Sequence, residues 1–299
     1  MGRSSCQNVL KVITMSIPPT KESAPQVILI TGSSSGIGLD SALRFRDMGW
    51  QVFATCRQEK DCKKLIKMGL ESFRLDYEDD ASITAGFNEA MKRSGGRIDV
   101  LFNNGAYGIP APVEDLPTPA LRQIFEANFF GWHSLTRLVL PVMIKAGHGR
   151  IIQNSSVLGF AALRVRGAYN ATKFALEGLT DTLRIELDGT GVHVALVQPG
   201  PIRTRIRENS YLQFKKWINW RGTRLEEMYK TRLIPRLKQK NPPKDRFELM
   251  PDAVTDTVVH AATSPRPKIR YQITTATKIM AVLKRITTSA GFERITKRL

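Results

Sequence analysis

The chain has 299 residues, of which 42% are hydrophobic and 24% are charged. This composition is typical of a globular protein and excludes disordered, collagen-like and disulfide-stapled chains. The net charge of +18 lies mainly in the last third, because residues 201–299 contain 23 Lys and Arg against 8 Asp and Glu. Such a charge attracts an anionic partner, which is a phosphorylated cofactor, a membrane surface, an acidic protein or nucleic acid.

Strand and helix patterns alternate along the chain. Short apolar runs predict seven strands, at residues 26–30, 51–55, 72–75, 100–103, 151–154, 192–197 and 269–273. Helical spacing predicts helices between them, at residues 37–48, 83–92, 120–144, 168–188 and 253–262. Parallel strands need crossover connections, which are usually helices. We therefore expect an α/β fold, with a doubly wound parallel sheet of about seven strands and helices on both faces.

Three parts are expected along the chain. Residues 1–25 are a flexible lead-in, residues 26–275 a single domain, and residues 276–299 a basic amphipathic extension. No apolar run reaches the roughly 18 residues that span a bilayer, and the lead-in lacks the apolar core of a secretory signal. The three cysteines, Cys6, Cys56 and Cys62, have no metal-ligand or redox spacing, which favours free thiols in a reducing compartment. We expect a cytoplasmic protein.

A glycine-rich turn follows the first predicted strand, where residues 31–38 read T-G-S-S-S-G-I-G at the start of a helix. Glycines let the backbone turn tightly and approach a pyrophosphate, and the positive end of the helix faces its charge. In this strand-turn-helix context the pattern predicts a dinucleotide site, and with it a Rossmann fold. The residues expected to contact the cofactor there are Gly32, Ser34, Ser35, Gly36, Ile37 and Gly38.

The end of the second predicted strand bears on which dinucleotide binds. NAD-specific sites place Asp or Glu there, but residues 52–57 read V-F-A-T-C-R. Arg57 can pair with a 2′-phosphate, so we expect NADP(H), although a solvated surface charge is the simpler interpretation of one arginine. Asp76 is a candidate partner of the adenine amino group or a turn residue. Asn104 closes the fourth strand at the carboxyl edge of the sheet, where ligands bind.

Tyr169 and Lys173 are spaced four residues apart on a predicted helix, so they share one face. A nearby ammonium group lowers the pKa of a phenol from about 10, which suits it to proton transfer near neutral pH. The spacing alone also fits an ordinary amphipathic helix.

Further motifs stand in order around this pair. Residues 128–131 read N-F-F-G, Ser156 precedes Tyr169 by thirteen residues, and residues 199–204 read P-G-P-I-R-T. With these motifs, over about residues 26–205, the chain resembles the short-chain dehydrogenase/reductase family. One departure is that the family's usual N-N-A-G is N-N-G-A at residues 103–106, which leaves both asparagines in register.

The resemblance implies a role for each matched residue. Ser156 would hydrogen-bond the substrate carbonyl oxygen and Tyr169 would protonate it, while Lys173 would bind the nicotinamide ribose and lower the pKa of Tyr169. Asn128 would hold a water that relays protons to Lys173. The remaining implied cofactor contacts are Pro199 and Gly200 in the P-G motif, and Ile202 and Thr204 at the carboxamide end.

The segment at residues 201–250 is the part that would cover the substrate in this family. Its aromatic residues, Tyr211, Phe214, Trp217, Trp220 and Tyr229, predict either a lid over an apolar substrate or a packed surface helix pair. The chain is similar to the branch with retinol dehydrogenases, hydroxysteroid dehydrogenases and bacterial NADP-dependent aldehyde reductases. The resemblance thus implies NADPH-dependent reduction of a lipophilic aldehyde or ketone, such as retinal, an aliphatic aldehyde or a steroid.

Two alternatives remain. A 3-oxoacyl-carrier-protein reductase would dock its acidic carrier on the positive surface, but such enzymes usually stop soon after the last strand. A protein that senses NADP(H) or binds nucleic acid would use the basic C-terminal face, but the chain has a full catalytic set and no known nucleic-acid motif.

The extension places Ile279, Val282, Leu283 and Ile286 on one helical face. Such a helix docks on its own protein or a second copy, or lies in a membrane interface, so peripheral membrane contact is an open alternative. Family members often pair through the helices that carry Asn128 and Tyr169, so we expect a homo-oligomer.

Overall fold

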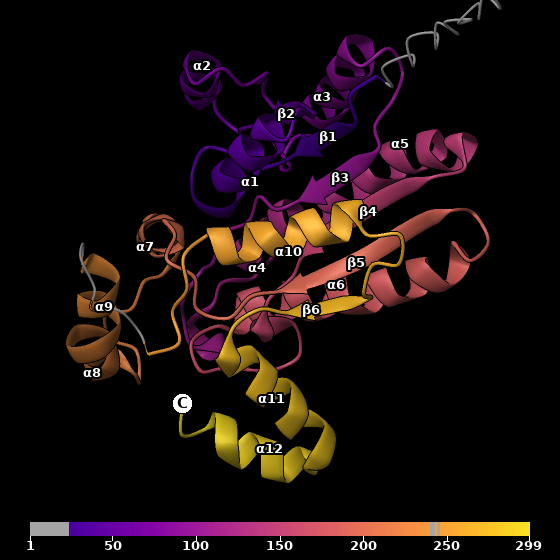
Figure 1. The fold of residues 1–299 in the computed structure, drawn as a ribbon. Coiled ribbons are helices and arrows are strands. Elements are labelled where there is room, and N and C mark those ends of the chain that lie inside the picture. Colours follow the sequence, from indigo (N-terminus) through magenta and orange to yellow (C-terminus); the bar gives the residue numbers. More distant parts are fainter. Residues whose placement is uncertain (1–23, 240–242, 244–245) are drawn as a thin grey trace, which may run out of the picture.

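Six parallel strands form one sheet in the computed structural model, which describes residues 24–239, 243 and 246–299. The strand order is β2-β1-β3-β4-β5-β6 (Figure 1). The strands are β1 (Val27–Ile30), β2 (Gln51–Ala54), β3 (Val100–Asn103), β4 (Gly149–Asn154), β5 (Val192–Gln198) and β6 (Arg270–Gln272). Most of their residues are buried, as expected for a parallel sheet that is covered on both faces. The predicted lead-in at residues 1–25 lies outside the described residues except for its last two.

Helices cover both faces of the sheet, which confirms the predicted doubly wound fold. One face carries α1 (Gly36–Asp47), α2 (Glu59–Lys67) and α10 (Asp252–Thr263), whose apolar side chains join one core cluster. The other face carries α3 (Asp80–Arg93), α5 (Gly131–Ala146) and α6 (Gly167–Glu186). The sequence patterns did not predict α2.

The expected strand at residues 72–75 is wrong, and the sheet has six strands rather than seven. Residues 71–75 do lie parallel to β2, but they form only two isolated bridges, Phe53 with Glu71 and Cys56 with Arg74. The hydrogen bond from the Cys56 nitrogen to the Phe73 oxygen between them is 3.4 Å long. This segment lies outside β2 at the edge of the sheet, where it has no further strand to pair with.

The predicted helix at residues 120–144 is a continuous helical segment with a change of pitch. It begins as α4 (Thr118–Phe125), passes through a π-helical turn (Glu126–Phe130) and continues as α5. A π turn inserts one residue into the helical repeat and often occurs at functional sites.

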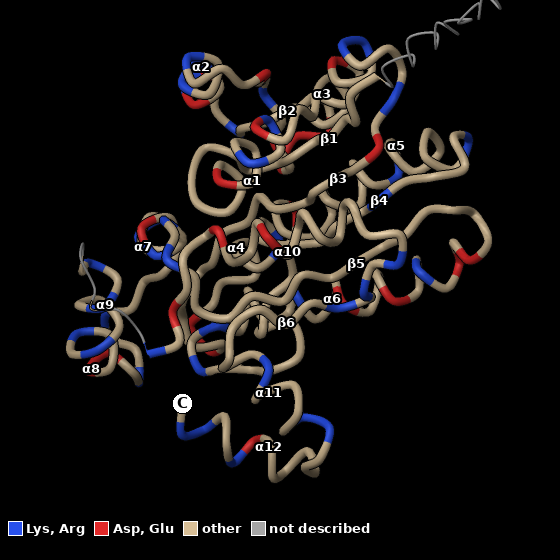
Figure 2. The backbone as a smooth tube through the Cα atoms, viewed as in Figure 1, with Lys and Arg blue, Asp and Glu red and all other residues tan. Residues whose placement is uncertain are grey.

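Two helical groups project from the sheet domain (Figure 1). The segment at residues 201–250, which we call the lid segment after its expected role, contains α7 (Ile206–Trp217), α8 (Glu226–Met228), a π turn (Tyr229–Leu233) and α9 (Ile234–Lys238). After β6 come α11 (Thr275–Ile286) and α12 (Ser289–Thr296). Lys and Arg are frequent in both groups (Figure 2). None of the described helices is long and apolar enough to cross a membrane.

Candidate active site

The glycine-rich turn connects β1 to α1 as predicted. Gly32 and Gly36 have left-handed backbone conformations, with φ of +64° and +60°. A Cβ atom on Gly32 would overlap the backbone of Gly105, and one on Gly38 would lie 2.5 Å from the carbonyl oxygen of Gly32. Only glycine fits these positions without a shift of the backbone, so the sequence pattern has a steric cause.

The start of α1 suits an anionic ligand. Ser34 is exposed, and Ser35 is the N-cap but forms no capping hydrogen bond with its side chain. Ile37 packs into the core and holds the helix against the sheet. The first turn of α1 contains no acidic residue. The backbone N–H groups of its first turn are therefore available to an anionic ligand such as a pyrophosphate.

Asn104 connects three strand ends at the carboxyl edge of the sheet. Its side-chain nitrogen donates to the Thr31 carbonyl oxygen at 3.0 Å, and its side-chain oxygen accepts from Asn154 at 2.8 Å. Thr31 follows β1 and Asn154 ends β4. Asn104 therefore fixes the glycine-rich turn relative to β4, the strand that precedes Ser156. The residue swap in N-N-G-A leaves this register intact, and Gly105 lies directly beside Gly32.

Asn128 lies in the π turn and is fully buried. Its side-chain nitrogen donates to the Tyr107 carbonyl oxygen at 2.8 Å, and its side-chain oxygen accepts from the Tyr107 nitrogen at 3.1 Å. A longer contact of 3.4 Å joins Asn128 to Thr172 on α6. Asn128 thus holds the loop after β3 next to the helix of Tyr169. The water relay that the family resemblance implies stays a prediction.

Ser156 and Tyr169 come together at the end of β4. The Ser156 hydroxyl accepts a hydrogen bond from the Leu158 nitrogen at 3.1 Å, which leaves its proton available for another acceptor. Burial raises the pKa of Tyr169 to about 12, and a hydrogen bond with Ser156 lowers it in part. We expected Lys173 to lower this pKa; here burial dominates instead. A phenol that keeps its proton at neutral pH is suited to act as an acid.

Lys173 is fully buried beneath Tyr169. Its ammonium nitrogen donates to the Asn154 carbonyl oxygen at 2.8 Å and lies 4.1 Å from the ring centroid of Trp132 and 5.5 Å from that of Tyr169. Burial lowers the pKa of Lys173 to about 7, while the charge of Glu177 raises it. The sequence analysis missed Trp132, although it directly follows the N-F-F-G motif.

We expect Lys173→Met to stabilise the fold most at low pH. Unfolded lysine keeps its proton to a pKa of about 10.4, so between pH 7 and 10 the unfolded chain binds a proton that the folded chain lacks, and this group's contribution to stability rises with pH. Below pH 7 the buried ammonium is a cost that Met removes. Thermal unfolding should show a higher midpoint for the variant at pH 6, by about 2–4 °C per kcal/mol, and a smaller gain at pH 9. An equal shift at both pH values, or one shared by the exposed control Lys92→Met, would contradict this.

Glu177 is a buried carboxylate that sequence reasoning did not single out. It follows Lys173 by one helical turn on α6 and accepts hydrogen bonds from the Ser155 hydroxyl and, at 2.9 Å, from the Gln198 amide. Arg270 on β6 contacts its other oxygen at 3.1 Å. A Cβ on Gly159 would lie 2.6 Å from the Ser155 hydroxyl, so this glycine leaves room for the network. Glu177 thus joins the serine loop, the end of β5 and the last strand beneath the site.

Arg57 is exposed just past β2, and it makes no ion pair with any residue that the structure describes. Asp76 is partly buried, and its two side-chain oxygens accept from the Glu78 nitrogen and from Arg74. Arg74 also donates to the carbonyl oxygen of Arg57. Arg57 is therefore placed to meet a ligand, whereas Asp76 already has partners in its turn.

The P-G motif lies beside the serine loop, because the Val157 nitrogen donates to the Pro199 oxygen at 2.8 Å. Thr204 packs against the glycine-rich turn, since a Cβ on Gly36 would lie 3.1 Å from the methyl group of Thr204.

The P-G motif also contacts the segment before α11, because a Cβ on Gly200 would overlap Thr274. Ile202 is partly buried on the α1 side of the core. The residues predicted to contact the pyrophosphate and the carboxamide end of the cofactor are thus neighbours in space.

The helix α7 lies close to Tyr169. A Cβ on Gly108 would lie 3.1 Å from the Ser210 hydroxyl and 3.9 Å from the Tyr169 ring. On the face of α7 that carries Ser210, Gln213 and Trp217 have buried polar atoms without a hydrogen-bond partner in the described part of the chain. The face of α7 that carries Ser210 therefore has polar as well as apolar groups.

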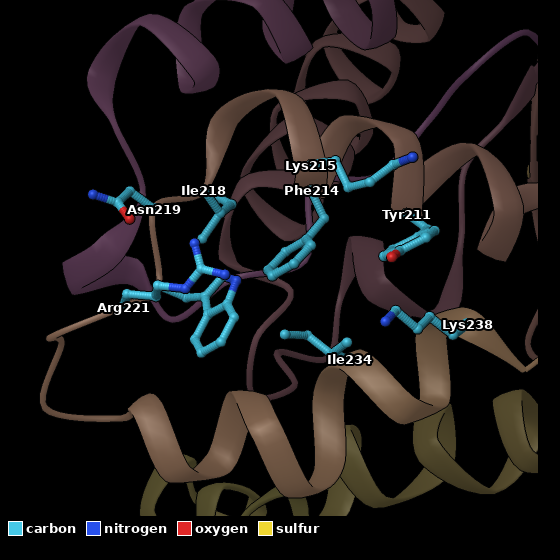
Figure 3. A pocket seen from close by; sticks show the side chains of 9 residues that line it. Tyr211, Phe214, Lys215, Ile218, Asn219, Arg221, Ile234 and Lys238 are labelled. Carbon is cyan, nitrogen blue, oxygen red and sulfur yellow. The ribbon is translucent and has the colours of Figure 1, made fainter.

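A cavity of about 290 Å³ separates α7 from α9. Figure 3 shows Phe214, Ile218 and Ile234 directed into it, with Arg221 at one edge. Ser156, Tyr169 and Lys173 do not line this cavity, which lies within the segment at residues 201–250.

The fold and the site together define a dinucleotide-binding oxidoreductase scaffold with a Ser-Tyr-Lys centre. A family model described as short chain dehydrogenase matches residues 26–214. "Uncharacterized oxidoreductase YbbO" of Escherichia coli K12 is 37% identical over 269 residues, which cover 90% of this chain and 93% of that protein. Human retinol dehydrogenase 8 is 31% identical, over 92% of this chain and 90% of that protein.

A solved short-chain dehydrogenase/reductase from Burkholderia phymatum, in complex with NAD, has a TM-score of 0.72 at 23% identity over 87% of this chain and 92% of that chain. The chain therefore belongs to the short-chain dehydrogenase/reductase family and is an oxidoreductase of that family. The resemblance to retinol dehydrogenases that the motifs indicated is confirmed as well.

Proposed function

We propose that this protein reduces lipophilic aldehydes or ketones with NADPH. The observation that carries the proposal is the convergence of Ser156, Tyr169 and Lys173 beside a glycine-rich turn that accepts no side chain. The turn, the free N-terminus of α1 and the contact of Thr204 with Gly36 fit a dinucleotide. When bound, the nicotinamide supplies the hydride that the carbonyl carbon accepts.

The chain's own residues bind and protonate the substrate. The Ser156 hydroxyl would donate to the carbonyl oxygen and orient it, and Tyr169, protonated at neutral pH, would transfer its proton to that oxygen. The buried Lys173 ammonium lies near the Tyr169 ring, where it would stabilise the phenolate that remains. In the reverse direction the same groups would accept the proton.

The choice of NADP(H) rests on Arg57, which is exposed and unpaired with any described acid, and on the absence of an acidic residue at residues 52–57. We expect Arg57→Ala to weaken NADPH binding by about 10–100-fold, the loss of one or two charge-assisted hydrogen bonds, and to leave NADH binding unchanged. Fluorescence titration with both cofactors measures this. An equal loss of affinity for NADPH and NADH would assign Arg57 a structural role instead. Lys60→Ala is the control for a nearby surface charge.

An apolar substrate is supported by the aromatic lid, much of which joins one core cluster with Tyr169. The name of the human relative, a retinol dehydrogenase, supports the same class. Gln213 and Trp217 would hydrogen-bond a polar group of the substrate away from its carbonyl.

Oxidation of NADPH at 340 nm with a panel of carbonyl compounds tests the proposal. The panel contains retinal, medium-chain aldehydes, steroid ketones and an acetoacetyl thioester. Turnover of the lipophilic members supports the proposal. Tight NADPH binding with no turnover of any member would contradict it and favour a binding protein.

A second candidate, reduction of a carbonyl on an acidic carrier protein, is favoured by arginines near the site. Arg166 lies three residues before Tyr169, and burial together with nearby Arg236 and Arg207 lowers its pKa to about 10. Such a surface attracts an acidic partner, so turnover of a carrier-bound substrate would fall steeply with salt. Turnover of a small uncharged aldehyde would depend little on the salt concentration.

We further propose a homo-oligomer that pairs through α5 and α6. Phe130, just before α5, is 46% exposed, and on α6 Phe174 and Ile185 are 43% and 78% exposed. Exposed apolar residues of this size on neighbouring helices are typical of an interface between subunits.

A further inference from the structure

The C-terminal helix α11 has two apolar faces, of which only one packs on the protein. Met280 is buried and Leu283 partly buried in a cluster with Ala161 and Phe292, next to the loop that carries Ser156. The expected single stripe is thus divided, because Leu283 points inward while its predicted neighbours do not. Packing within the protein accounts for the apolar residues on the inner face of α11, but not for those on its outer face.

The outer face of α11 exposes three aliphatic side chains in a row. Ile279, Val282 and Ile286 are 47%, 56% and 72% exposed and are spaced three and four residues apart. They form an apolar stripe two turns long, which we call the outer stripe. Exposed aliphatic residues are unremarkable when scattered, but a contiguous row on a helix marks a contact surface.

Cations lie beside the outer stripe. Lys278 and Arg285 are exposed and stand one turn before and one turn after Val282, and neither forms an ion pair with a described residue. Residues 276–299 carry six Lys and Arg and a single acid, Glu293, which pairs with Lys297 at 2.7 Å. A helix with an apolar stripe and long cationic side chains at its flank can bury the stripe in a bilayer interface while the charged ends reach the headgroups.

The positive charge beside the outer stripe favours a lipid surface over a second copy of the chain as its binding partner. A second copy would bring the same cations against each other, and their repulsion opposes self-association through this face. A lipid surface with anionic headgroups instead attracts each cation. The helices α11 and α12 stand apart from the lid and from the sheet domain's other helices, at the end of the molecule beyond β6 (Figure 1). That position allows a flat surface to reach them.

We propose that the outer stripe docks this protein on the surface of anionic membranes. The helix lies in the interface and does not cross it. This inference does not depend on which carbonyl compound the enzyme reduces.

Flotation of the full-length protein with vesicles tests the docking. One set of vesicles is phosphatidylcholine, and the other contains phosphatidylserine as well. We expect binding to the anionic set only, weakened by high salt, and lost when Ile279, Val282 and Ile286 are replaced together by Ser. Lys278→Glu and Arg285→Glu should each weaken binding about fivefold or more. All three aliphatic side chains are exposed, so these variants should keep their fold and their turnover of a soluble aldehyde.

The matched controls are Ile66→Ser, which replaces an isoleucine on α2 that is 55% exposed, and Lys92→Glu on α3. Absence of binding to anionic vesicles overturns the proposal. So does binding that the triple Ser variant retains, because it would then depend on charge elsewhere. If sedimentation shows instead a dimer that only the triple Ser variant loses, the stripe is an interface between copies and the proposal is wrong.

Discussion

Tyr169→Phe is expected to lose nearly all carbonyl reduction while binding NADPH as tightly as the unchanged protein. The variant removes one hydroxyl group and keeps the ring that lies near Lys173 and the lid. General acid catalysis contributes about 10²–10⁴-fold, so kcat should fall by that factor. Because the phenol holds its proton to a pKa of about 12, it is the acid at every pH where the protein would be assayed.

The measurement is NADPH oxidation at 340 nm, paired with a cofactor titration by fluorescence. Tyr271→Phe is the matched control, because its hydroxyl contacts the Lys268 nitrogen and the His260 ring, away from Ser156. A Tyr169→Phe protein within threefold of normal kcat would refute the assignment of Tyr169 as proton donor. Loss of NADPH binding in the variant would show that the hydroxyl holds the cofactor instead.

Glu177→Gln should alter the pH profile of the enzyme as well as its stability. Glu177 faces Lys173 on its own helix and Arg270 from β6, and its charge raises the pKa of Lys173. Without that charge the pKa of Lys173 falls further, so the ammonium loses its proton at lower pH and the alkaline limb of kcat/KM moves toward acid. The rate should therefore fall more at pH 8 than at pH 6. Loss of a buried charge-assisted hydrogen bond costs about 2 kcal/mol of stability.

Asp181→Asn separates these two effects. Asp181 pairs with the same Arg270 and with Arg184, but it is not among the groups that shift Lys173. We expect this control to lose stability without a change in the pH profile. If both variants shift the profile alike, or neither does, Glu177 supports the fold only and does not position the charge of Lys173.

The sequence was sufficient to predict the six strands that form the sheet and the residues at its carboxyl edge. The strands β1 and β3 are apolar throughout because a covered parallel sheet needs such side chains, and Gly32 and Gly38 stand where a Cβ atom would overlap the backbone. These requirements are local, so they leave a pattern in consecutive residues. The order and spacing of the remaining motifs then identified Ser156, Tyr169 and Lys173.

Contacts between distant residues were decided only by the tertiary structure. Glu177 looks like any helical acid in the sequence, because Ser155, Gln198 and Arg270 approach it from segments 21 to 93 residues away. The pKa of Tyr169 was predicted in the wrong direction for the same reason, since its burial depends on the whole fold.

The sequence by itself determined the family and the doubly wound fold, because both depend on short-range geometry that restricts the residue type at each position. The catalytic roles of Ser156, Tyr169 and Lys173 stay predictions. The tertiary structure alone decided that residues 71–75 do not complete a seventh strand, that Leu283 packs inward while Val282 stays exposed, and that a carboxylate lies beneath Lys173. Strand pairing at a sheet edge, burial and desolvation all depend on the residues that surround a position. Those neighbours come together only when the chain folds.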